Sequence, residues 1–507
     1  MELTHTTRSV GNLESVFDGK FEQAVDGDIT LPEYCPDVLR ILRCTIEPAV
    51  HSVQAGIERA TVEGAARVVV LYAAEDGSLQ SFEQSYPFSR QVDIPGLEES
   101  AAVTAVVKTE FANGRAVSQR RLDCHGMMSI HLGARRRRED AVLTEVSGGG
   151  IQTLGDTIRV SSLQALSAAT FPLSEVIEID PGAPAVDQVI LRQAVVVPSE
   201  VKAIKNKLLV KGNVETHVAY RSRGASEPVQ LMHVMPLSQI IEAPGVSEAT
   251  ENTLRLRVNS LDVTPKADSN GAARLLEVTA RVGADVRGYA PEDLPVIKDA
   301  YSTQGGVRPE LRRLDTRRLE ESFRESFTAK ESYDFGAGGI ENVLLLSGEV
   351  LPPEVIVKSD AVTVTGKTKF HVVYTDAEGS IVLADKELSY NYRRAVANID
   401  SLTADVEVQL LSVQENVSGG NLEIRAELAA FGEVFAAESR SVVGTVELDE
   451  DDAIPVRAPL TIYFASDGEP LWEIAKRYRT TMEAVQRENE LAADTATTGQ
   501  MLLIPSV

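Results

Sequence analysis

Thiols and imidazoles are the side chains of this chain best suited to binding a metal, and five residues of these types in its first third are the candidates. They are Cys35, Cys44, Cys124, His125 and His131. A structural zinc site usually draws its ligands from close pairs such as Cys-x2-Cys or His-x3-His, and none of these residues stands in such a pair. The pattern favours buried thiols and solvated imidazoles, so we predict no metal site and no bound cofactor.

Carboxylates form the second chemical candidate, in the acidic run from Glu447 to Asp452. A calcium loop needs oxygen ligands at spaced positions and a glycine for its turn, and this run has neither. Like charges repel and extend a chain, so we predict an acidic linker over residues 447–456. The sequence also lacks a phosphate-binding glycine loop, a nucleophile elbow and an assignable carboxylate pair. We therefore predict no catalytic residues and no enzymatic activity.

The charge balance excludes several classes of partner. The 507 residues include 50 basic and 75 acidic side chains, for a net charge of −25. Binding to nucleic acid or to an anionic membrane needs clustered Lys and Arg. The one basic run, residues 135–138, is followed at once by Glu139 and Asp140. We interpret this run as a solvated surface turn, with a partner-docking role as the alternative.

The elements that must carry any function show no sign of membrane insertion or export. No segment has the roughly eighteen consecutive apolar residues of a membrane span. Residues 1–10 lack the apolar stretch of a secretory signal. Three cysteines are an odd and sparse set, which fits reduced thiols better than a disulfide framework. We expect a cytoplasmic protein with no nucleic-acid partner and no direct membrane insertion.

One strand pattern occurs three times along the chain. Each copy reads Val-x-Gly with a tyrosine eight residues after the glycine, and the glycines are Gly64, Gly212 and Gly366. They lie 148 and 154 residues apart (212 − 64 and 366 − 212). Apolar strings precede the glycines in the same order, at residues 41–43, 190–192 and 343–345. We therefore predict three homologous modules, over residues 15–150, 151–305 and 306–446.

Period-two alternation predicts that these modules are mainly β. Side chains from Val62 to Tyr72 alternate between two faces of a strand, and Asp76-Gly77 then offers a type I′ turn. Repeated hairpins of this kind predict a sandwich of antiparallel strands in each module. His217 and His371 share a repeat position that holds valine in the first copy, which favours packing over acid–base chemistry.

One segment breaks the strand pattern at the start of the third module. Between Pro309 and Glu331, the apolar residues fall at near-helical spacing amid many charges; they are Leu311, Leu314, Leu319, Phe323 and Phe327. This spacing predicts a helical connector.

The last fifty residues follow a βααβ order. A short strand over 460–464 and a turn over 466–470 precede an apolar helical stripe, and a second helix begins at Thr480 or Thr481. This string resembles a LysM domain, a module that usually grips N-acetylglucosamine polymers. We place it at residues 457–507. Its expected core comprises Leu471, Trp472, Ile474, Ala475, Tyr478 and Ile504.

The LysM resemblance implies a groove between the loop before the first helix and the loop after the second. The residues at those places are Asp467, Gly468, Glu469, Pro470, Asn489, Glu490 and Leu491. The common Gly-Asp-Thr-Leu-Trp turn reads Gly-Glu-Pro-Leu-Trp here, so Pro470 removes a donor and Glu469 adds bulk and charge. This departure disfavours sugar binding and favours a protein contact at the groove or its rim. Simple packing of a small domain is the alternative for each residue taken singly.

The body of the chain resembles SPOCS domains, modules of spore-coat assembly proteins. The resemblance rests on residues 31–42, on the Val-x-Gly-x7-Tyr strand and on Asp299-Ala300-Tyr301-Ser302. Three such modules before a LysM domain resemble SipL-type spore-coat morphogenesis proteins. This architecture implies a non-enzymatic mother-cell scaffold at the forespore surface. Its LysM domain would hold the coat's morphogenetic ATPase, and its SPOCS modules would bind other coat proteins.

Two other functions stay open at this stage. A LysM domain also fits a protein that binds peptidoglycan, the N-acetylglucosamine polymer of the cell wall or spore cortex. A hydrolase with cryptic carboxylates is the third and weakest reading.

Overall fold

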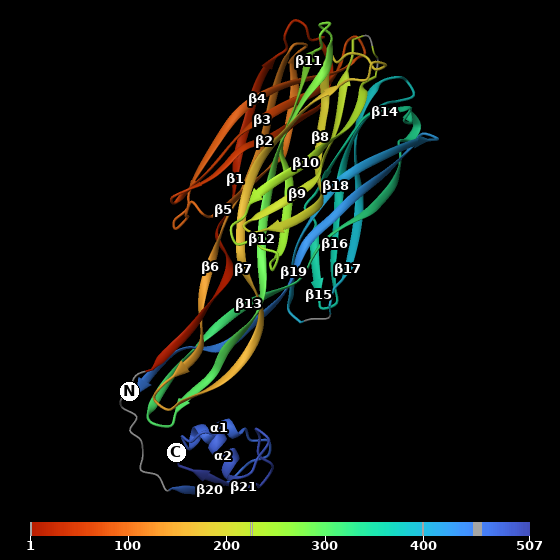
Figure 1. The fold of residues 1–507 in the computed structure, drawn as a ribbon. Coiled ribbons are helices and arrows are strands. Elements are labelled where there is room, and N and C mark those ends of the chain that lie inside the picture. The colour runs from red at the N-terminus through yellow and green to blue at the C-terminus, as the bar shows by residue number, and fades with distance from the viewer. Residues whose placement is uncertain (1–2, 224, 226, 398–399, 450–458, 507) are drawn as a thin grey trace.

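The computed structural model describes residues 3–223, 225, 227–397, 400–449 and 459–506. The molecule is elongated, with three β lobes at one end, a narrower stalk, and a small C-terminal domain beyond the stalk (Figure 1). Its secondary structure is mainly strand, and the two α-helices of the described ranges both lie in the C-terminal domain. The prediction of a mainly β fold ending in a small βααβ domain is confirmed.

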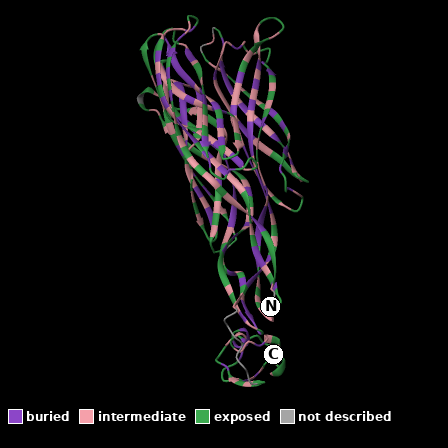
Figure 2. Ribbon diagram, turned by 90° about the vertical axis from the view of Figure 1, so that its left-hand side faces the viewer, coloured by how far each residue is buried: buried purple, intermediate pink, exposed green. Residues whose placement is uncertain are grey.

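The first module is a sandwich of two three-stranded antiparallel sheets, ordered β1-β6-β5 and β2-β3-β4. Its strands are β1 (Thr4–Thr30), β2 (Val38–Gly56), β3 (Arg59–Ala74), β4 (Leu79–Asp93), β5 (Ala102–Ser118) and β6 (Arg121–Ser147). Alternate side chains of both sheets form one apolar core, as their period-two pattern requires. Figure 2 shows buried and more exposed residues alternating along the strands of the molecule.

The second module repeats this topology, with sheets β11-β12-β7 and β10-β9-β8. Its strands are β7 (Ile151–Glu178), β8 (Gln188–Ile204), β9 (Lys207–Arg221), β10 (Val229–Glu242), β11 (Glu251–Ala267) and β12 (Ala273–Ser302).

The third module has the same order, except that one strand is divided. Its strands are β13 (Gly306–Asp334), β14 (Asn342–Val350), β15 (Glu354–Lys358), β16 (Ala361–Thr375), β17 (Ile381–Ala395), β18 (Leu402–Ser418) and β19 (Asn421–Asp449). A 3-10 turn, Gly336–Gly338, follows β13. Strands β14 and β15 both pair with β16, in the place that β2 and β8 occupy in the other modules. Pro352 and Pro353 lie at the break. They explain it, because proline has no backbone N–H to donate to a strand partner.

The repeated glycine and tyrosine have structural roles that the fold explains. The Tyr72 and Tyr220 rings are buried, and each hydroxyl donates to a proline carbonyl 36 residues upstream, Pro36 O at 3.2 Å and Pro184 O at 3.1 Å. A Cβ at Gly64 or Gly212 would overlap a backbone carbonyl oxygen of the neighbouring strand. The strand pattern therefore marks a close backbone approach beside a buried, tethered ring.

The strand register moves one repeat landmark by a residue. Each module has a β-bulge after its first pairs, at Leu42, Ile190 and Leu344. The residue after each bulge pairs with the same place on the central strand, so Arg43 corresponds to Leu191 and Leu345. The expected match of residues 190–192 with residues 41–43 is therefore off by one position, because similar apolar strings align almost equally well in either register.

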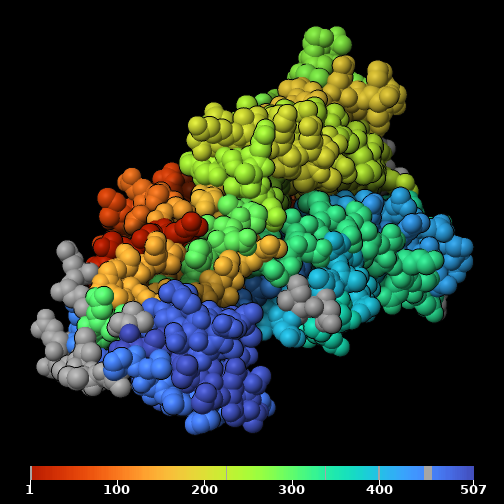
Figure 3. Space-filling view, turned by 60° about the horizontal axis from the view of Figure 1, so that its bottom comes forward, coloured from red at the N-terminus to blue at the C-terminus, as the bar shows by residue number. Residues whose placement is uncertain are grey.

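The first and last strands of each module run past its sandwich and form the stalk. Three ribbons pair residues 4–15 with 135–147, 151–163 with 289–302, and 306–319 with 435–449. Their inward side chains form a cluster with members from all three modules, namely Val10, Val142, Ile158, Val160, Leu294, Val296, Leu314 and Val442. The three modules therefore share an apolar core in the stalk, while each keeps its own core in its lobe. Figure 3 shows the lobes packed side by side.

Three local predictions are corrected by the stalk. Residues 309–331 lie in strand β13 and not in a helical connector. Phe323 and Phe327 are four residues apart, which places them on one face of a strand as well as of a helix, whereas a β-bulge at Glu320 turns Leu319 to the other face. The pairing with β19 decides for the strand. The start of the expected acidic linker, residues 447–449, is also strand, since it ends β19; residues 450–456 lie outside the described ranges.

The basic run at residues 135–138 lies inside β6 and not in a turn. Its Arg137 donates from Nε to the carbonyl oxygen of Leu163 at 2.6 Å, which links the first module to the second. Arg136 pairs with Glu14 on the neighbouring strand at 2.6 Å. These contacts give the run a structural role inside the molecule.

Candidate binding site

The C-terminal domain is built from two short strands and two short helices. Strand β20 (Leu460–Phe464) pairs antiparallel with β21 (Met501–Pro505), and helices α1 (Leu471–Arg477) and α2 (Met482–Glu488) lie between them in sequence. Helix α2 begins after Thr481, whose hydroxyl accepts a hydrogen bond from Ala484 N at 3.0 Å. Such a cap satisfies one of the free amides at a helix start, which explains where this helix begins.

The residues that we placed in the domain core lie together. Leu471, Ile474, Ala475 and Ile504 are at most 2% exposed, and Trp472 is 7% exposed. Tyr478 packs against this cluster and meets the Tyr463 ring edge-on, with 5.6 Å between ring centroids.

The two loops that would flank a groove are largely exposed. Asp467, Gly468, Pro470 and Glu490 are exposed, whereas Glu469, Asn489 and Leu491 are half-buried. Four of the seven predicted groove residues are therefore accessible to a partner.

Glu469 turns its carboxylate toward the domain. It accepts hydrogen bonds from Tyr463 Oη at 2.9 Å and from Ser466 N at 3.0 Å, and Arg477 lies at 3.4 Å. The Ser466 amide, the Tyr463 hydroxyl and Arg477 hold the pKa of Glu469 below its usual range. The charge of Glu469 therefore serves to fasten the turn between β20 and α1.

Most hydrogen-bond donors of the two loops are used within the domain. Gly468 N donates to Ala496 O at 3.1 Å, Leu471 N to Asp494 O at 2.8 Å, and Leu491 N to Gln486 O at 2.9 Å. The Asn489 amide is fully engaged, since it donates to Val485 O at 2.8 Å and Leu503 O at 2.7 Å and accepts from Leu503 N at 2.7 Å. The hydrogen-bonding capacity of these groups is therefore used inside the domain, where it fixes the conformation of the two loops.

Helix α1 docks on the stalk end of the second module. Asp299 accepts a hydrogen bond from Trp472 Nε1 at 2.9 Å and pairs with Lys476 Nζ at 2.6 Å. Trp472 and Lys476 are four residues apart and share one face of α1. One carboxylate thus binds both an indole N–H and an ammonium group, which fixes the orientation of the helix.

Tyr301 completes this contact. Its ring meets the Trp472 ring edge-on at 4.8 Å between centroids, and its hydroxyl donates to Thr480 O at 2.7 Å. Burial raises the pKa of Tyr301, since the apolar surroundings disfavour the phenolate. We call Asp299 and Tyr301 the docking pair. The docking leaves Asp467, Gly468, Pro470 and Glu490 of the groove loops exposed.

Asp299 and Tyr301 belong to the string that resembles SPOCS domains, and nothing in that string predicts their contact with the C-terminal domain. A comparison of the three copies would have singled them out. Each stalk ribbon has a β-bulge at an equivalent place, namely Thr144, Lys298 and Gly444. Counting from the bulge, Asp299 corresponds to Glu145 and Thr445, and Tyr301 to Ser147 and Glu447. Only the second copy has an aspartate and an aromatic ring at these positions.

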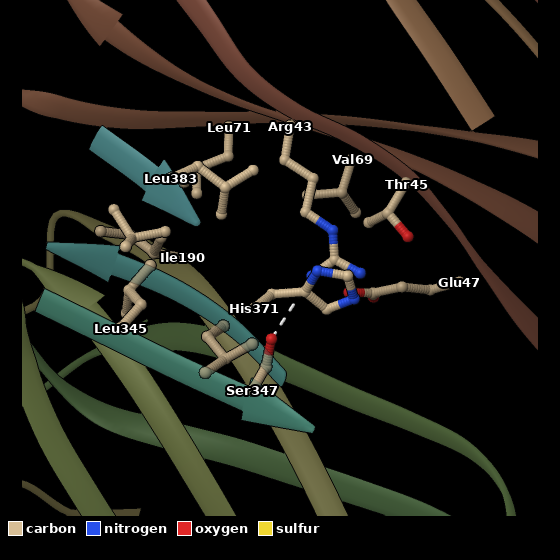
Figure 4. Close-up of a pocket in the computed structure, with 12 residues that line it drawn as sticks. Arg43, Thr45, Glu47, Val69, Leu71, Ile190, Leu345, Ser347, His371 and Leu383 are labelled. Atoms are coloured by element: carbon tan, nitrogen blue, oxygen red, sulfur yellow. Dashed lines mark hydrogen bonds between the residues drawn. The ribbon is translucent and has the colours of Figure 1, made fainter. Parts of the chain in front are cut away.

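A small cavity lies between the three modules, and Figure 4 shows residues that line it. Its volume is about 50 Å³, and all three modules line it, with Arg43, Ile190 and His371 among the lining residues. This volume has room for about three water molecules. Arg43 Nη1 donates to Ser347 Oγ at 3.3 Å across the cavity.

His371 supplies the titratable imidazole of this cavity. Its Nδ1 lies 2.7 Å from Asp385 Oδ1, while its Nε2 has no hydrogen-bond partner among the described residues. Burial and the neighbouring Arg43 charge lower the pKa of His371. At neutral pH the imidazole is therefore uncharged and packs between modules, as the valine in the first copy suggested.

Comparison with known families matches both parts of the molecule. The SipL SPOCS domain family matches residues 37–115 and 185–266, and the LysM domain family matches residues 467–505. The chain carries SPOCS and LysM domains. The matched SPOCS segments lie in the first and second modules, and the third module shares their strand order. No curated protein and no solved structure matches the chain.

The two family matches limit the range of functions that fit the molecule. SPOCS and LysM are non-catalytic families, and together they fit a coat-associated protein of sporulation with a LysM module of the peptidoglycan-binding type. Across the described ranges, no three His, Cys, Asp or Glu side chains gather as a metal site would require. Neither described helix has the length and apolarity needed to cross a membrane.

Proposed function

We propose that this protein is a non-enzymatic scaffold of spore-coat assembly, which binds the coat's morphogenetic ATPase through the exposed loops of its LysM domain. Its place would be the mother-cell cytoplasm, at the forespore surface. The SPOCS modules would contact other coat proteins. Several weak contacts on one rigid body bind strongly together, because each bound site raises the effective concentration of the next.

The engaged loop donors carry this proposal. An acetamido group is recognised by free backbone or amide donors, but Gly468, Leu471 and Leu491 donate within the domain and Asn489 is saturated. Pro470 has no N–H to offer. The exposed charges of Asp467 and Glu490 remain, and they suit a basic surface on a protein partner better than an uncharged glycan.

A second surface of the LysM domain agrees with a protein partner. Strand β20 turns Ile462 and Phe464 outward, and Met501 lies beside them on β21; these side chains are between 54 and 65% exposed. Figure 1 shows this ribbon on the side of the domain away from the stalk. Grouped apolar side chains on a free face are typical of protein contacts.

Charge reversal at the loops tests the proposal. The full-length chain and its Asp467→Lys/Glu490→Lys variant would be compared for capture of the purified coat ATPase, with Thr498→Lys as the control on a neighbouring exposed position. We expect the loop variant to lose at least about tenfold in affinity, since reversal of a contact charge costs more than 1.4 kcal/mol. Unchanged capture by the loop variant would exclude the loops as the partner surface.

Peptidoglycan binding is the second candidate, because the LysM match itself favours it. It predicts that the full-length chain sediments with purified peptidoglycan at micromolar affinity and does not capture the coat ATPase. Sedimentation lost in the loop variant and kept in Thr498→Lys would establish a glycan site in the predicted groove.

A further inference from the structure

Two of the three cysteines lie against the same small space inside the first module. Cys44 is on β2, in one sheet of the sandwich, and Cys124 is on β6, in the other. Gly114 on β5 is the direct cross-strand partner of Cys124. A Cβ built at Gly114 would lie 3.3 Å from Cys44 Sγ and 3.7 Å from Cys124 Sγ. Both sulfur atoms therefore border the volume that this glycine leaves empty.

The other modules show that this arrangement is specific to the first. Counted from the equivalent β-bulges, Gly114 corresponds to Val263 and Glu415, and their cross-strand partners are Val278 and Ile424. Cys44 corresponds to Arg192 and Leu346. The first module alone combines two thiols with a glycine that leaves room between the sheets.

We propose that Cys44 and Cys124 form a redox modification site, at which a peroxide converts the two thiols into a disulfide that joins the two sheets of the first module. The bond would close a loop containing β3, β4 and β5. It would hold β2 against β6 and so restrain the sandwich from opening. This inference is independent of what the LysM domain binds.

The surroundings of the two thiols give each a distinct role. Cys124 is 2% exposed, whereas Cys44 is half-buried and is the thiol that a small oxidant can reach. The interaction with Cys44 lowers the pKa of Cys124, and the same contact with burial raises the pKa of Cys44. Cys124 is therefore the sulfur that more readily becomes the attacking thiolate.

The chemistry balances in two steps. Hydrogen peroxide enters on the Cys44 side, and the Cys124 thiolate attacks it and becomes a sulfenic acid, as an S–O bond forms, the O–O bond breaks and the departing hydroxide leaves with the former thiol proton as one water. The Cys44 sulfur then attacks the sulfenic sulfur of Cys124, so that the S–S bond forms and the S–O bond breaks. The departing hydroxide takes up the proton of the Cys44 thiol and leaves as a second water. In sum, two thiols and one peroxide give one disulfide and two waters.

Cys35 provides the internal control. Cys35 is buried in the same core, but its sulfur is not among the atoms nearest to the space at Gly114. Burial raises the pKa of its thiol. Hydrogen peroxide should therefore leave Cys35 as a free thiol while it joins the other two.

The test uses the full-length folded chain. After reduction, removal of reductant and exposure to hydrogen peroxide, the protein is unfolded, alkylated and analysed by intact mass and peptide mapping. We expect one alkylated thiol, at Cys35, and a linked peptide containing Cys44 and Cys124. Cys35→Ser should still form the bond, whereas Cys44→Ser and Cys124→Val should not. The valine is the residue that the second module holds at this place, so that variant should fold.

Thermal unfolding supplies the second readout. The oxidised wild-type chain should unfold at a higher temperature than the reduced chain, and peroxide should leave Cys124→Val unshifted. Three alkylated thiols after oxidation, a bond that includes Cys35, or only intermolecular disulfides would overturn the proposal.

Discussion

The stalk ends of the second and first modules have the same backbone and different neighbours. Both ribbons carry a β-bulge, at Lys298 and at Thr144, and both continue for a few residues as paired strand. The second end presents Asp299 and Tyr301 and holds the LysM domain, whereas the first presents Glu145 and Ser147 at these positions. Two side chains on an otherwise repeated scaffold thus decide where the terminal domain sits.

The difference is one of reach and shape. Serine has no ring to cover the indole of Trp472 and cannot extend to the Thr480 carbonyl. Glutamate is one methylene longer than aspartate, so its carboxylate would not meet Trp472 and Lys476 at the distances that Asp299 provides. A repeat protein can therefore assign a unique contact to one copy without changing the fold of the others.

The largest expected effect comes from removing the docking pair of the second stalk end. We expect Asp299→Ala/Tyr301→Ser to release the LysM domain, because it removes a charge-assisted bond, an ion pair and an aromatic contact together worth on the order of 3 kcal/mol. Trp472 is the only tryptophan, so its fluorescence emission should shift to longer wavelength as the indole becomes exposed.

The matched control alters the equivalent positions of the first ribbon. Glu145→Ala/Ser147→Ala should leave the tryptophan emission of the folded chain unchanged. Identical emission from both double variants would show that the docking pair does not hold the LysM domain in solution.

A second prediction compares the repeated glycines. A methyl group at Gly212 would overlap the carbonyl oxygen of Val197, whereas one at Gly366 would meet the Tyr390 side chain, which can move. We expect Gly212→Ala to lower the free energy of unfolding by about 1–3 kcal/mol, and Gly366→Ala to lower it less. Urea denaturation of the two variants measures the difference. Equal losses would mean that the third module is as tightly closed as the second.

A smaller effect is expected from Tyr301→Phe, which keeps the ring and removes one hydrogen bond. Docking should weaken by about 1 kcal/mol, because Thr480 O loses its donor. The pKa of Tyr301 is raised in the folded chain, so its contribution is present below pH 10 and is lost as pH rises through the folded pKa. Tryptophan emission of the wild-type chain should therefore change as the pH is raised from 9 to above 10, and the phenylalanine variant should not show this change.

The smallest expected effect concerns the cavity between the three modules. The pKa of His371 is lowered on folding, so the unfolded chain takes up a proton first as pH falls, and stability should drop below about pH 6.5. His371→Val, which copies Val69 of the first module, should remove the part of the acid-induced loss of stability that His371 causes. That part is at most about 1.4 kcal/mol in the free energy of unfolding per pH unit. Urea midpoints at pH 7.5 and 5.5 measure it. An unchanged acid dependence in the variant would assign the effect to other groups.

Much of the fold could be predicted because its signals are local. Alternation from Val62 to Tyr72 predicts a strand, and the Thr481 cap fixes the start of α2. Residues 309–331 show the limit of that reasoning, since side chains four residues apart share a face in either structure. The long pairing of β13 with β19 settles the matter, and no local pattern contains it.

The candidate site was predictable only as far as its own domain. The LysM string predicted the helices and the loops, but Glu469 was expected to bring bulk and charge to the groove, whereas in the structure it turns inward to fasten its own turn. Asp299 lies 173 residues before Trp472 and carries no feature that by itself points to a partner.

The sequence by itself determined the three copies, their strand alternation and the terminal βααβ unit, because these follow from side-chain period, turn residues and caps within short segments. The tertiary structure decided that three ribbons close around one core, that one stalk end receives the LysM domain, and that two thiols face one space. Those outcomes depend on contacts between residues far apart in the chain, where shape and hydrogen-bond geometry select among arrangements that the local pattern leaves equal.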